Sequence, residues 1–338
     1  MRSASITLLC LGAIAVVGCA DDQTTPGDAA TDTGAADGSR DAAADAGVVS
    51  CTFPALRIAG TPETDALASS PAKCGAPAYS WSTDAELGTV RRTGFTRPFL
   101  LALVTALFES EGVVLPEPPT HTVAMQQYAY VTQDRGQTVE ATALVTYPTD
   151  LSPDDGPRDV ILFLHGTSGF ASGCGVSESL GYQGLAAFFS GYGYTTVMPD
   201  YLGLGFLETE TDDPHAYLVG EAVALAALDA VRAAADLDPS QRGNTCMAPR
   251  VLVYGASQGG HAALWTERLA PYYAPELEIV GTVATVPPSA LIDQSERAFS
   301  TLVSATGNLT AALTLMAPWY GYEDRLDEVF VAPWDADL

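Results

Sequence analysis

The sequence predicts an α/β fold with a mostly parallel sheet and helices on both faces. The continuous apolar run at 159–164 and the stretch 194–200 have the length and character of strands covered on both sides. Helical segments alternate with these runs, which is the order that crossover connections between parallel strands produce. A third apolar run leads into a Gly-x-Ser-x-Gly motif at 255–259, and a helix-forming segment follows it.

The first 48 residues are predicted to lie outside this fold. A short apolar run from 6 to 17 follows Met1-Arg2 and has the form of a signal peptide, too short to span a bilayer. Residues 16–19 resemble a bacterial lipobox, so 1–19 is predicted as a lipoprotein signal peptide with Cys19 as the lipidated residue. An ordinary secretory signal cleaved nearby is the alternative. Either places the protein outside the cytoplasm, as a cell-envelope lipoprotein attached to the outer membrane or as a secreted protein.

Charge and composition exclude some partners. Residues 20–48 consist mostly of Asp, Ala, Thr and Gly, and we interpret them as a disordered acidic linker. The chain carries a formal net charge of −26 with Lys73 as its only lysine. Such a chain repels nucleic acid, so no nucleic-acid partner is expected. The folded α/β domain is predicted over 49–286 and a helical cap over 287–338.

The elements of the domain follow in order. From 51 to about 119 the pattern is irregular, with one helix expected over 99–108. Two strands joined by a turn at 134–137 then form an opening hairpin. The later strands and helices alternate. We expect strands at 123–132, 139–147, 159–164, 194–200, 251–256 and 279–286, and helices at 182–190, 221–235 and 262–269.

After 287 the pattern becomes helical. Apolar residues recur at helical spacing from 289 to 317, and several aromatic residues follow. This favours an inserted cap. The alternative is another core helix that packs on the sheet.

Four cysteines remain once Cys10 is assigned to the signal and Cys19 to the lipid. An exported protein folds in an oxidising compartment, so Cys51, Cys74, Cys174 and Cys246 are disulfide candidates. Three pairings are possible. We favour Cys51–Cys74 with Cys174–Cys246. A zinc site is the competing interpretation, but the spacings fit no metal motif, and no metal is predicted.

Ser257 is the candidate nucleophile, because the strand-turn-helix setting of its motif projects a serine hydroxyl outward. An ordinary Gly-rich turn is the alternative. Attack by a serine creates an oxyanion that needs preorganised N–H donors. The backbone N–H of Gln258 and a second N–H from Gly166 or Thr167, in the loop after the strand 159–164, are predicted to form the oxyanion hole.

The histidines do not fit the base. In this fold class the nucleophile precedes the acid and the base along the chain. His121, His165 and His215 all precede Ser257, and His261 lies in the helix that follows it. His165 is predicted to anchor the oxyanion loop, and His215 to make a cap or loop contact. Asp200 also precedes Ser257, and Asp293 falls in the predicted cap, so neither is assigned as the acid.

Several motifs together resemble the secretory lipase family of α/β-hydrolases. These are the segments 165–167, 199–205, 213–218 and 255–260, in the family's order and spacing over roughly residues 120–338. The resemblance implies an α/β-hydrolase fold with an inserted helical lid. It also implies hydrolysis of carboxylic esters, with ester or acylglycerol substrates. The sequence shows no phosphate loop, dinucleotide fingerprint or metal cluster, so no cofactor is expected. Asp200 and Tyr201 match a family loop near the site and, with His165, are predicted to shape the pocket.

The main departure concerns the acid and the base. In this family they come from strands after the lid, whereas this sequence ends within or just after the predicted lid. The hypothesis is a truncated copy, with Ser257 and the oxyanion hole present and the C-terminal strands missing. The leading function is therefore a serine carboxylic ester hydrolase whose acid and base lie beyond Leu338. The alternative is an inactive, surface-anchored binding module, and a peptidase or acyl transferase remains a third possibility.

Overall fold

A computed structural model describes residues 51–62, 79–110, 112–205, 214–237, 245–300 and 305–330. The predicted signal peptide, Cys19, the acidic linker and Cys74 lie outside the described residues, as do residues 331–338.

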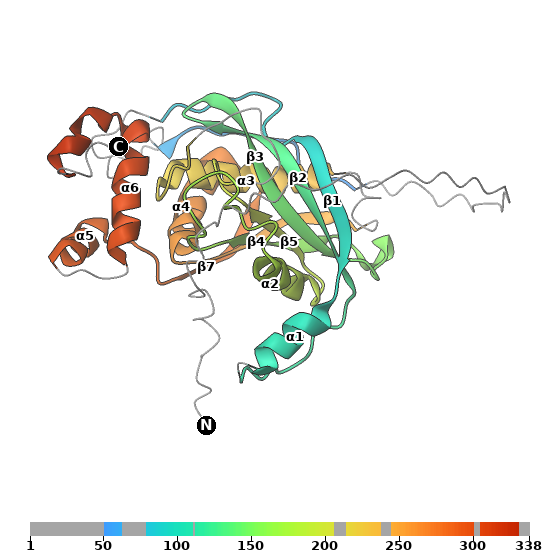
Figure 1. Ribbon diagram of the computed structural model, residues 1–338. Helices are drawn as coiled ribbons and strands as arrows, with labels where there is room; N and C mark the ends of the chain where they lie inside the picture. The colour runs from blue at the N-terminus through green and yellow to red at the C-terminus, as the bar shows by residue number, and fades with distance from the viewer. Residues whose placement is uncertain are drawn as a thin grey trace, which may run out of the picture.

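The described residues build a seven-stranded mixed sheet with the strand order β1-β2-β3-β5-β4-β6-β7 (Figure 1). The strands β2, β5, β4, β6 and β7 run in one direction, and β1 and β3 run in the other. This confirms the predicted mostly parallel sheet and its opening hairpin. The strands are β1 Val90–Phe99, β2 Val123–Asp134, β3 Gln137–Pro148, β4 Arg158–Leu164, β5 Thr195–Pro199, β6 Met247–Ala256 and β7 Glu278–Thr285.

Helices cover both faces of the sheet, as predicted. The helices are α1 Leu101–Ser110, α2 Leu180–Ser190, α3 Gly220–Asp236, α4 Gln258–Tyr273, α5 Leu291–Ser300 and α6 Ala305–Tyr320. Alternate residues of a strand point to opposite faces. In β4, Leu162 packs into the core under α3 and α4, whereas Phe163 packs into a second core with residues of α2. The continuous apolar runs of the sequence are therefore strands buried on both sides.

One strand was not expected from the sequence. β1 falls in the region predicted to be irregular, and it pairs antiparallel with β2 through two register shifts. It is an edge strand with several exposed residues, and arginines and a glycine interrupt any alternation of polar and apolar residues. The helix expected at 99–108 forms as α1. Its Phe108 packs edge-to-face on Phe188 of α2, with ring centroids 4.9 Å apart.

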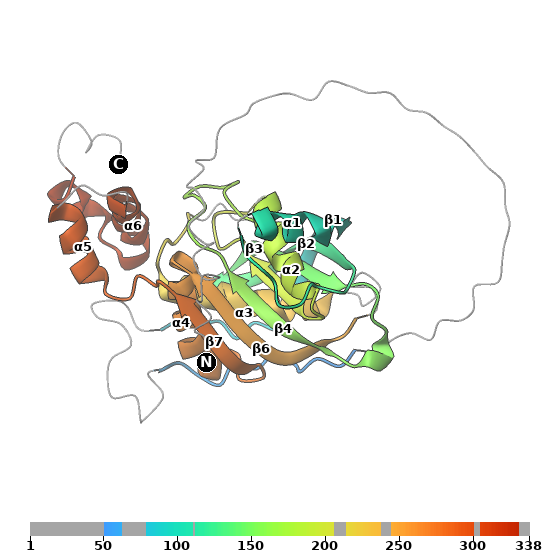
Figure 2. The same ribbon diagram turned by 90° about the horizontal axis from the view of Figure 1, so that it is seen from below.

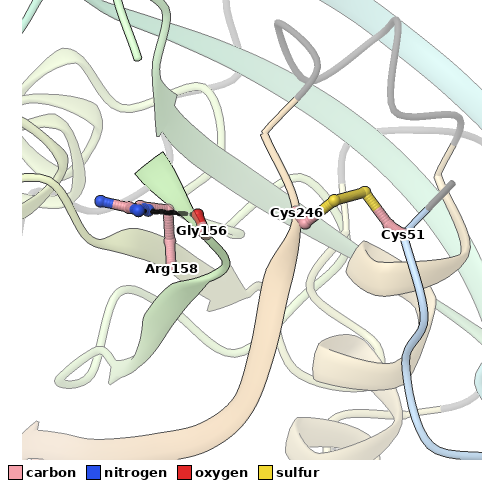
Figure 3. The surroundings of a disulfide bond; sticks show 4 residues. All are labelled: Cys51, Gly156, Arg158 and Cys246. Carbon is pink, nitrogen blue, oxygen red and sulfur yellow. Dashed lines mark hydrogen bonds between the residues drawn. A yellow bond between two sulfur atoms is a disulfide. The ribbon is translucent and has the colours of Figure 1, made fainter. Parts of the chain in front are cut away.

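The predicted disulfide pairing is wrong. Cys51 is bonded to Cys246, with the two Cα atoms 5.3 Å apart (Figure 3). Cys174 is also disulfide-bonded, whereas Cys74 lies outside the described residues. The backbone N–H of Arg158 donates to the carbonyl of Cys246 at 2.8 Å. The bridge therefore ties the N-terminal segment to the starts of β4 and β6. The sequence could not show this contact, because its two cysteines are 195 residues apart.

Replacing both Cys51 and Cys246 with serine is expected to lower the free energy of unfolding by about 2–5 kcal/mol. The bridge closes a very long loop, and such a crosslink restricts the unfolded chain most. Urea unfolding under non-reducing conditions measures the change. A double variant that unfolds at the same urea concentration as the parent would show that this bridge contributes nothing.

The C-terminal helices α5 and α6 lie together beyond one end of the sheet in both views (Figures 1 and 2). The buried Trp319 at the end of α6 donates its indole N–H to Asp134 at 2.8 Å. Arg135 donates to the carbonyl of Pro318 at 3.2 Å. The tip of the β2–β3 hairpin therefore holds the C-terminal end of α6. None of the described helices is long and apolar enough to cross a bilayer.

Candidate active site

Ser257 occupies a sharp turn between a strand and a helix. β6 ends at Ala256, α4 begins at Gln258, and Ser257 lies between them with φ 56° and ψ −120°. A positive φ is unfavourable for a residue with a side chain and persists only where the surroundings enforce it. The backbone N–H of Ser257 donates to the carbonyl of Thr285 at 3.0 Å, which fixes the turn to the end of β7.

Two glycines make the turn possible. A Cβ on Gly259 would overlap the carbonyl oxygen of Leu164, and a Cβ on Gly255 would overlap the carbonyl oxygen of Gly259. The first turn of α4 can therefore lie against β4 and β6 only because Gly255 and Gly259 have no side chain. The close approach leaves Ser257 partly exposed at the N-terminus of α4, where the helix dipole favours negative charge.

The predicted oxyanion loop lies at the same end of the sheet. β4 and β6 are parallel neighbours, and their register pairs Leu164 with Gly255. Gly166 is two residues after Leu164, and Ser257 is two residues after Gly255. The loop after β4 therefore begins beside Ser257 at the same edge of the sheet. The first N–H groups of a helix have no partner within the helix, which leaves that of Gln258 for a ligand. The N–H of Ser257 itself is already bonded to Thr285.

His165 is buried and holds the start of this loop. Its Nδ1 lies 2.6 Å from the carbonyl oxygen of Gly166, and its Nε2 lies 3.4 Å from that of Asp200. Burial lowers the pKa of His165 to about 4, so the ring is neutral at neutral pH. Tyr201 stacks on it with centroids 4.1 Å apart and donates its hydroxyl to the carbonyl of His165 at 2.9 Å.

Asp200 is fully buried behind the loop. Its carboxylate accepts hydrogen bonds from the hydroxyl of Thr142 and the backbone N–H of Ser177, each at 2.7 Å. Burial raises the pKa of Asp200 to about 6, and the hydrogen bonds oppose that rise. Asp200 thus connects β3 and the segment around Ser177 at the end of β5. This position agrees with leaving Asp200 unassigned as the acid.

His215 also stacks on Tyr201. The two rings are nearly parallel, 7° apart in orientation, with centroids 6.2 Å apart. His215 Nδ1 lies 2.8 Å from the carbonyl oxygen of Leu202, and its Nε2 lies 3.0 Å from the side-chain nitrogen of Gln258. The loop contact predicted for His215 is therefore present, but its link to Gln258 was not foreseen. The sequence offered one signal for it, the Asp-Pro-His-Ala-Tyr-Leu segment at 213–218.

His261 follows one turn into α4 and is almost completely buried. Burial lowers the pKa of His261 to about 4. Of the histidines in the described ranges, none hydrogen bonds to the side chain of Ser257. The described residues also contain no group of three or more His, Cys, Asp or Glu side chains that could hold a metal ion.

The side of the site toward the helices α5 and α6 is apolar and aromatic. Tyr217 bonds Thr167 through their hydroxyls at 2.7 Å and meets Phe170 edge-to-face with centroids 5.1 Å apart. Tyr217 and Leu218 form a cluster with Ala312 of α6, and Phe170 packs against it. The sequence pattern did not single out Tyr217 as part of the site. Its hydroxyl links the predicted oxyanion loop to the surface under α6.

Comparisons with known proteins agree with this geometry. Residues 186–321 match the family described as "Secretory lipase". No curated protein sequence matches the chain. The structure is similar to a rice cell wall degrading esterase LipA from Xanthomonas oryzae, with a TM-score of 0.58 and 25% identity over 70% of this chain and 61% of the esterase.

A second similar structure is Candida antarctica lipase A in its closed state. It has a TM-score of 0.52 and 19% identity, over 82% of this chain and 58% of the lipase. The chain spans less than two thirds of the length of both solved structures. The predicted resemblance to secretory lipases and the predicted fold are thereby confirmed. The chain carries an α/β-hydrolase domain that matches the secretory lipase family over residues 186–321.

Proposed function

We propose that this protein is a carboxylic ester hydrolase of the lipase and esterase type, with Ser257 as its nucleophile. One observation carries the proposal. Ser257 has a positive φ in a turn between β6 and α4, beside the loop that follows β4. A turn of this strained kind is the setting in which α/β-hydrolases present their serine. The family match and the names of the similar structures, an esterase and a lipase, support the same reaction.

The chemistry follows from this arrangement. The hydroxyl oxygen of Ser257 attacks the ester carbonyl carbon while a base removes its proton. The carbonyl oxygen becomes an oxyanion, which accepts hydrogen bonds from the N–H of Gln258 and from the Gly166-Thr167 loop. The bond between carbon and the alcohol oxygen then breaks, and the alcohol leaves with the proton. Water repeats these steps on the acyl-serine and releases the acid.

The acid and the base are proposed to lie beyond Leu338. Two features of the described residues support this. Of the described histidines, His121 pairs with Asp150, His165 and His215 contact loop carbonyls and stack on Tyr201, and His261 is buried within α4. In addition, β7 pairs only with β6 and is partly exposed along its whole length, so its outer edge is open to a further strand. Without these groups only residual catalysis is expected.

The substrate is proposed to be an ester or acylglycerol with an apolar acyl chain. The helices α5 and α6 would act as its cap. The apolar cluster of Tyr217, Leu218 and Ala312 lies between the site and α6 and offers a surface for such a chain. Export, with or without a lipid at Cys19, fits the Cys51–Cys246 disulfide, because such bonds persist in oxidising compartments.

Replacing Ser257 with alanine is expected to lower hydrolysis of a p-nitrophenyl ester to the rate without protein, a loss on the order of 10³-fold or more in the full-length protein. The variant lacks the hydroxyl group that is proposed to form the acyl intermediate. Initial rates over an acyl-chain series measure the loss, and peptide substrates tested in parallel separate a peptidase from an esterase. Ser152→Ala, in the exposed loop before β4, is the matched control and should keep parental rates. Equal rates for Ser257→Ala and its parent would remove Ser257 from the mechanism.

The second candidate function is an inactive, surface-anchored binding module. The observation that favours it is that no described histidine hydrogen bonds to the side chain of Ser257. The two functions make opposite predictions for covalent labelling of Ser257.

A further inference from the structure

The side chain of Gln258, directly after Ser257, is held by a buried histidine from a distant part of the chain. Gln258 is the first residue of α4 and is 1% exposed. Its amide nitrogen lies 3.0 Å from Nε2 of His215, which is also 1% exposed. A buried hydrogen bond of this kind is costly to break, because each partner then loses its solvation without compensation.

The second contact of His215 fixes the direction of this bond. Nδ1 lies 2.8 Å from the carbonyl oxygen of Leu202, and a carbonyl can only accept, so Nδ1 carries the proton. In the neutral ring Nε2 is then an acceptor, and Gln258 must donate its amide hydrogen to it. Burial favours the neutral ring. The amide of Gln258 is thereby set in one orientation.

The start of α4 needs such a support. Ser257 makes no side-chain hydrogen bond to cap the helix, although its backbone is strained. The residue whose side chain is held, Gln258, also carries the N–H proposed to stabilise the oxyanion. Fixing its side chain limits the rotation of its backbone, and small errors in the position of such a donor weaken the stabilisation of the transition state.

The same loop also supports the other half of the proposed oxyanion hole. Tyr201 stacks on both His165 and His215, with ring centroids 4.1 Å and 6.2 Å away. It donates its hydroxyl to the carbonyl of His165, and His165 in turn contacts the carbonyl of Gly166. Leu202, the next residue, accepts from His215. The loop after β5 thus reaches Gly166 through His165 and Gln258 through His215.

We propose that His215 is a positioning residue, which holds Gln258 so that the backbone N–H of Gln258 points at the developing oxyanion. The inference rests on the proposed function of Ser257. His215 does not act as the base. Nδ1 is bonded to Leu202 and Nε2 to Gln258, so neither nitrogen is free to take a proton from Ser257.

Three variants separate this role from simple packing. His215→Phe keeps a flat ring beside Tyr201 but removes both hydrogen bonds. His215→Gln restores an acceptor for the amide of Gln258. Gln258→Met removes the donor and keeps a side chain of similar length. In the double variant, His215→Phe with Gln258→Met, neither of these two side chains is left with a buried polar atom that has lost its hydrogen bond.

Ester hydrolysis and the rate of phosphonylation at Ser257 by a fluorophosphonate are measured for each full-length variant. We expect His215→Phe to lower kcat and the phosphonylation rate by about 10–100-fold, with KM changed by less than about threefold. His215→Gln should recover part of the loss. Gln258→Met should cause most of the loss seen in His215→Phe, and the double variant should lose no more than His215→Phe, because both changes break the contact between His215 and Gln258. Parental rates in His215→Phe would overturn the proposal, as would additive losses.

A second measurement does not depend on catalysis. ¹⁵N NMR of the parent should show the His215 ring protonated at Nδ1 and not at Nε2, and His215→Phe should shift the backbone amide signal of Gln258. An unmoved signal would overturn the positioning role. If Ser257→Ala hydrolyses esters as fast as the parent, the proposed function fails, and the amide signal alone then decides whether His215 holds Gln258.

Discussion

Replacing Gly259 with alanine is expected to abolish reaction at Ser257 and to reduce the yield of folded protein sharply. The added methyl group would overlap the carbonyl oxygen of Leu164, and the carbonyl of His165 lies only 2.7 Å from the same position. Both obstacles are backbone atoms of β4 and of the loop after it. They cannot rotate away as a side chain could, so α4 must shift away from the sheet. That shift moves Ser257 and Gln258 away from the loop at Gly166.

The control for Gly259→Ala is a glycine at which an added methyl group meets no other atom. Gly181, in the first turn of α2, has no atom within 4 Å of an added Cβ. Gly181→Ala should therefore fold and react as the parent does, or be more stable by up to about 1 kcal/mol, because alanine favours a helix. Thermal unfolding and ester hydrolysis measured side by side test the pair. Full activity in Gly259→Ala would show that α4 does not approach β4 as closely as described.

Replacing Arg232 with methionine is expected to lower the free energy of unfolding by about 3–5 kcal/mol, because it leaves buried carboxylates without their cation. Arg232 of α3 donates to Asp229 at 2.7 Å and to Glu276 at 2.6 Å. Asp229 is fully buried and also accepts from Thr132 and Tyr273, at 2.8 Å and 2.7 Å. This cluster joins β2, α3 and the end of α4 below the site.

The loss should depend on pH in a defined direction. Burial raises the pKa of Asp229 above its ordinary value, and the charge of Arg232 opposes the rise. Without that charge the pKa of Asp229 in the folded state rises further. A group with a raised folded pKa destabilises the folded state as pH rises through the interval between its unfolded and folded pKa values. Arg232→Met should therefore be closer in stability to its parent at acid pH than at neutral pH.

Urea unfolding at two pH values measures both effects. Arg250→Met is the matched control, because Arg250 pairs with Asp159 at 2.9 Å on the surface and is half exposed. Exposed pairs contribute at most about 1 kcal/mol, so this variant should change little. If both variants lowered the free energy of unfolding equally, the buried ion pairs of Arg232 would contribute no more to stability than the exposed pair of Arg250.

The sequence predicted the sheet because most of its strands are buried on both faces. β4 is largely a continuous apolar run, a pattern that favours a strand covered on both faces, and β5 is buried along its whole length. β1 was missed because it is an edge strand whose arginines are exposed. The pairing of Cys51 with Cys246 was missed for a different reason. It depends on where the N-terminal segment crosses the starts of β4 and β6, and residue spacing carries no information on that path.

The candidate site shows the same division. The turn at Ser257 and the loop at Gly166 could be placed from the sequence, because a glycine-framed turn and a strand end leave local patterns. The contact between His215 and Gln258 joins residues 43 positions apart through their side chains, and no local pattern encodes it. The order along the chain argued against His215 as the base, and the positioning role proposed for it depends on a contact that is visible only in three dimensions.

The most direct test of the central claim is covalent labelling of the full-length, folded protein with a fluorophosphonate, followed by mass spectrometry of its peptides. If Ser257 is the nucleophile of an ester hydrolase, one label per chain should appear on the peptide that contains Ser257. It should be absent from Ser257→Ala and from urea-unfolded protein. A folded protein that takes up no label, or that carries it on another residue, would contradict the claim and leave the binding module as the better account.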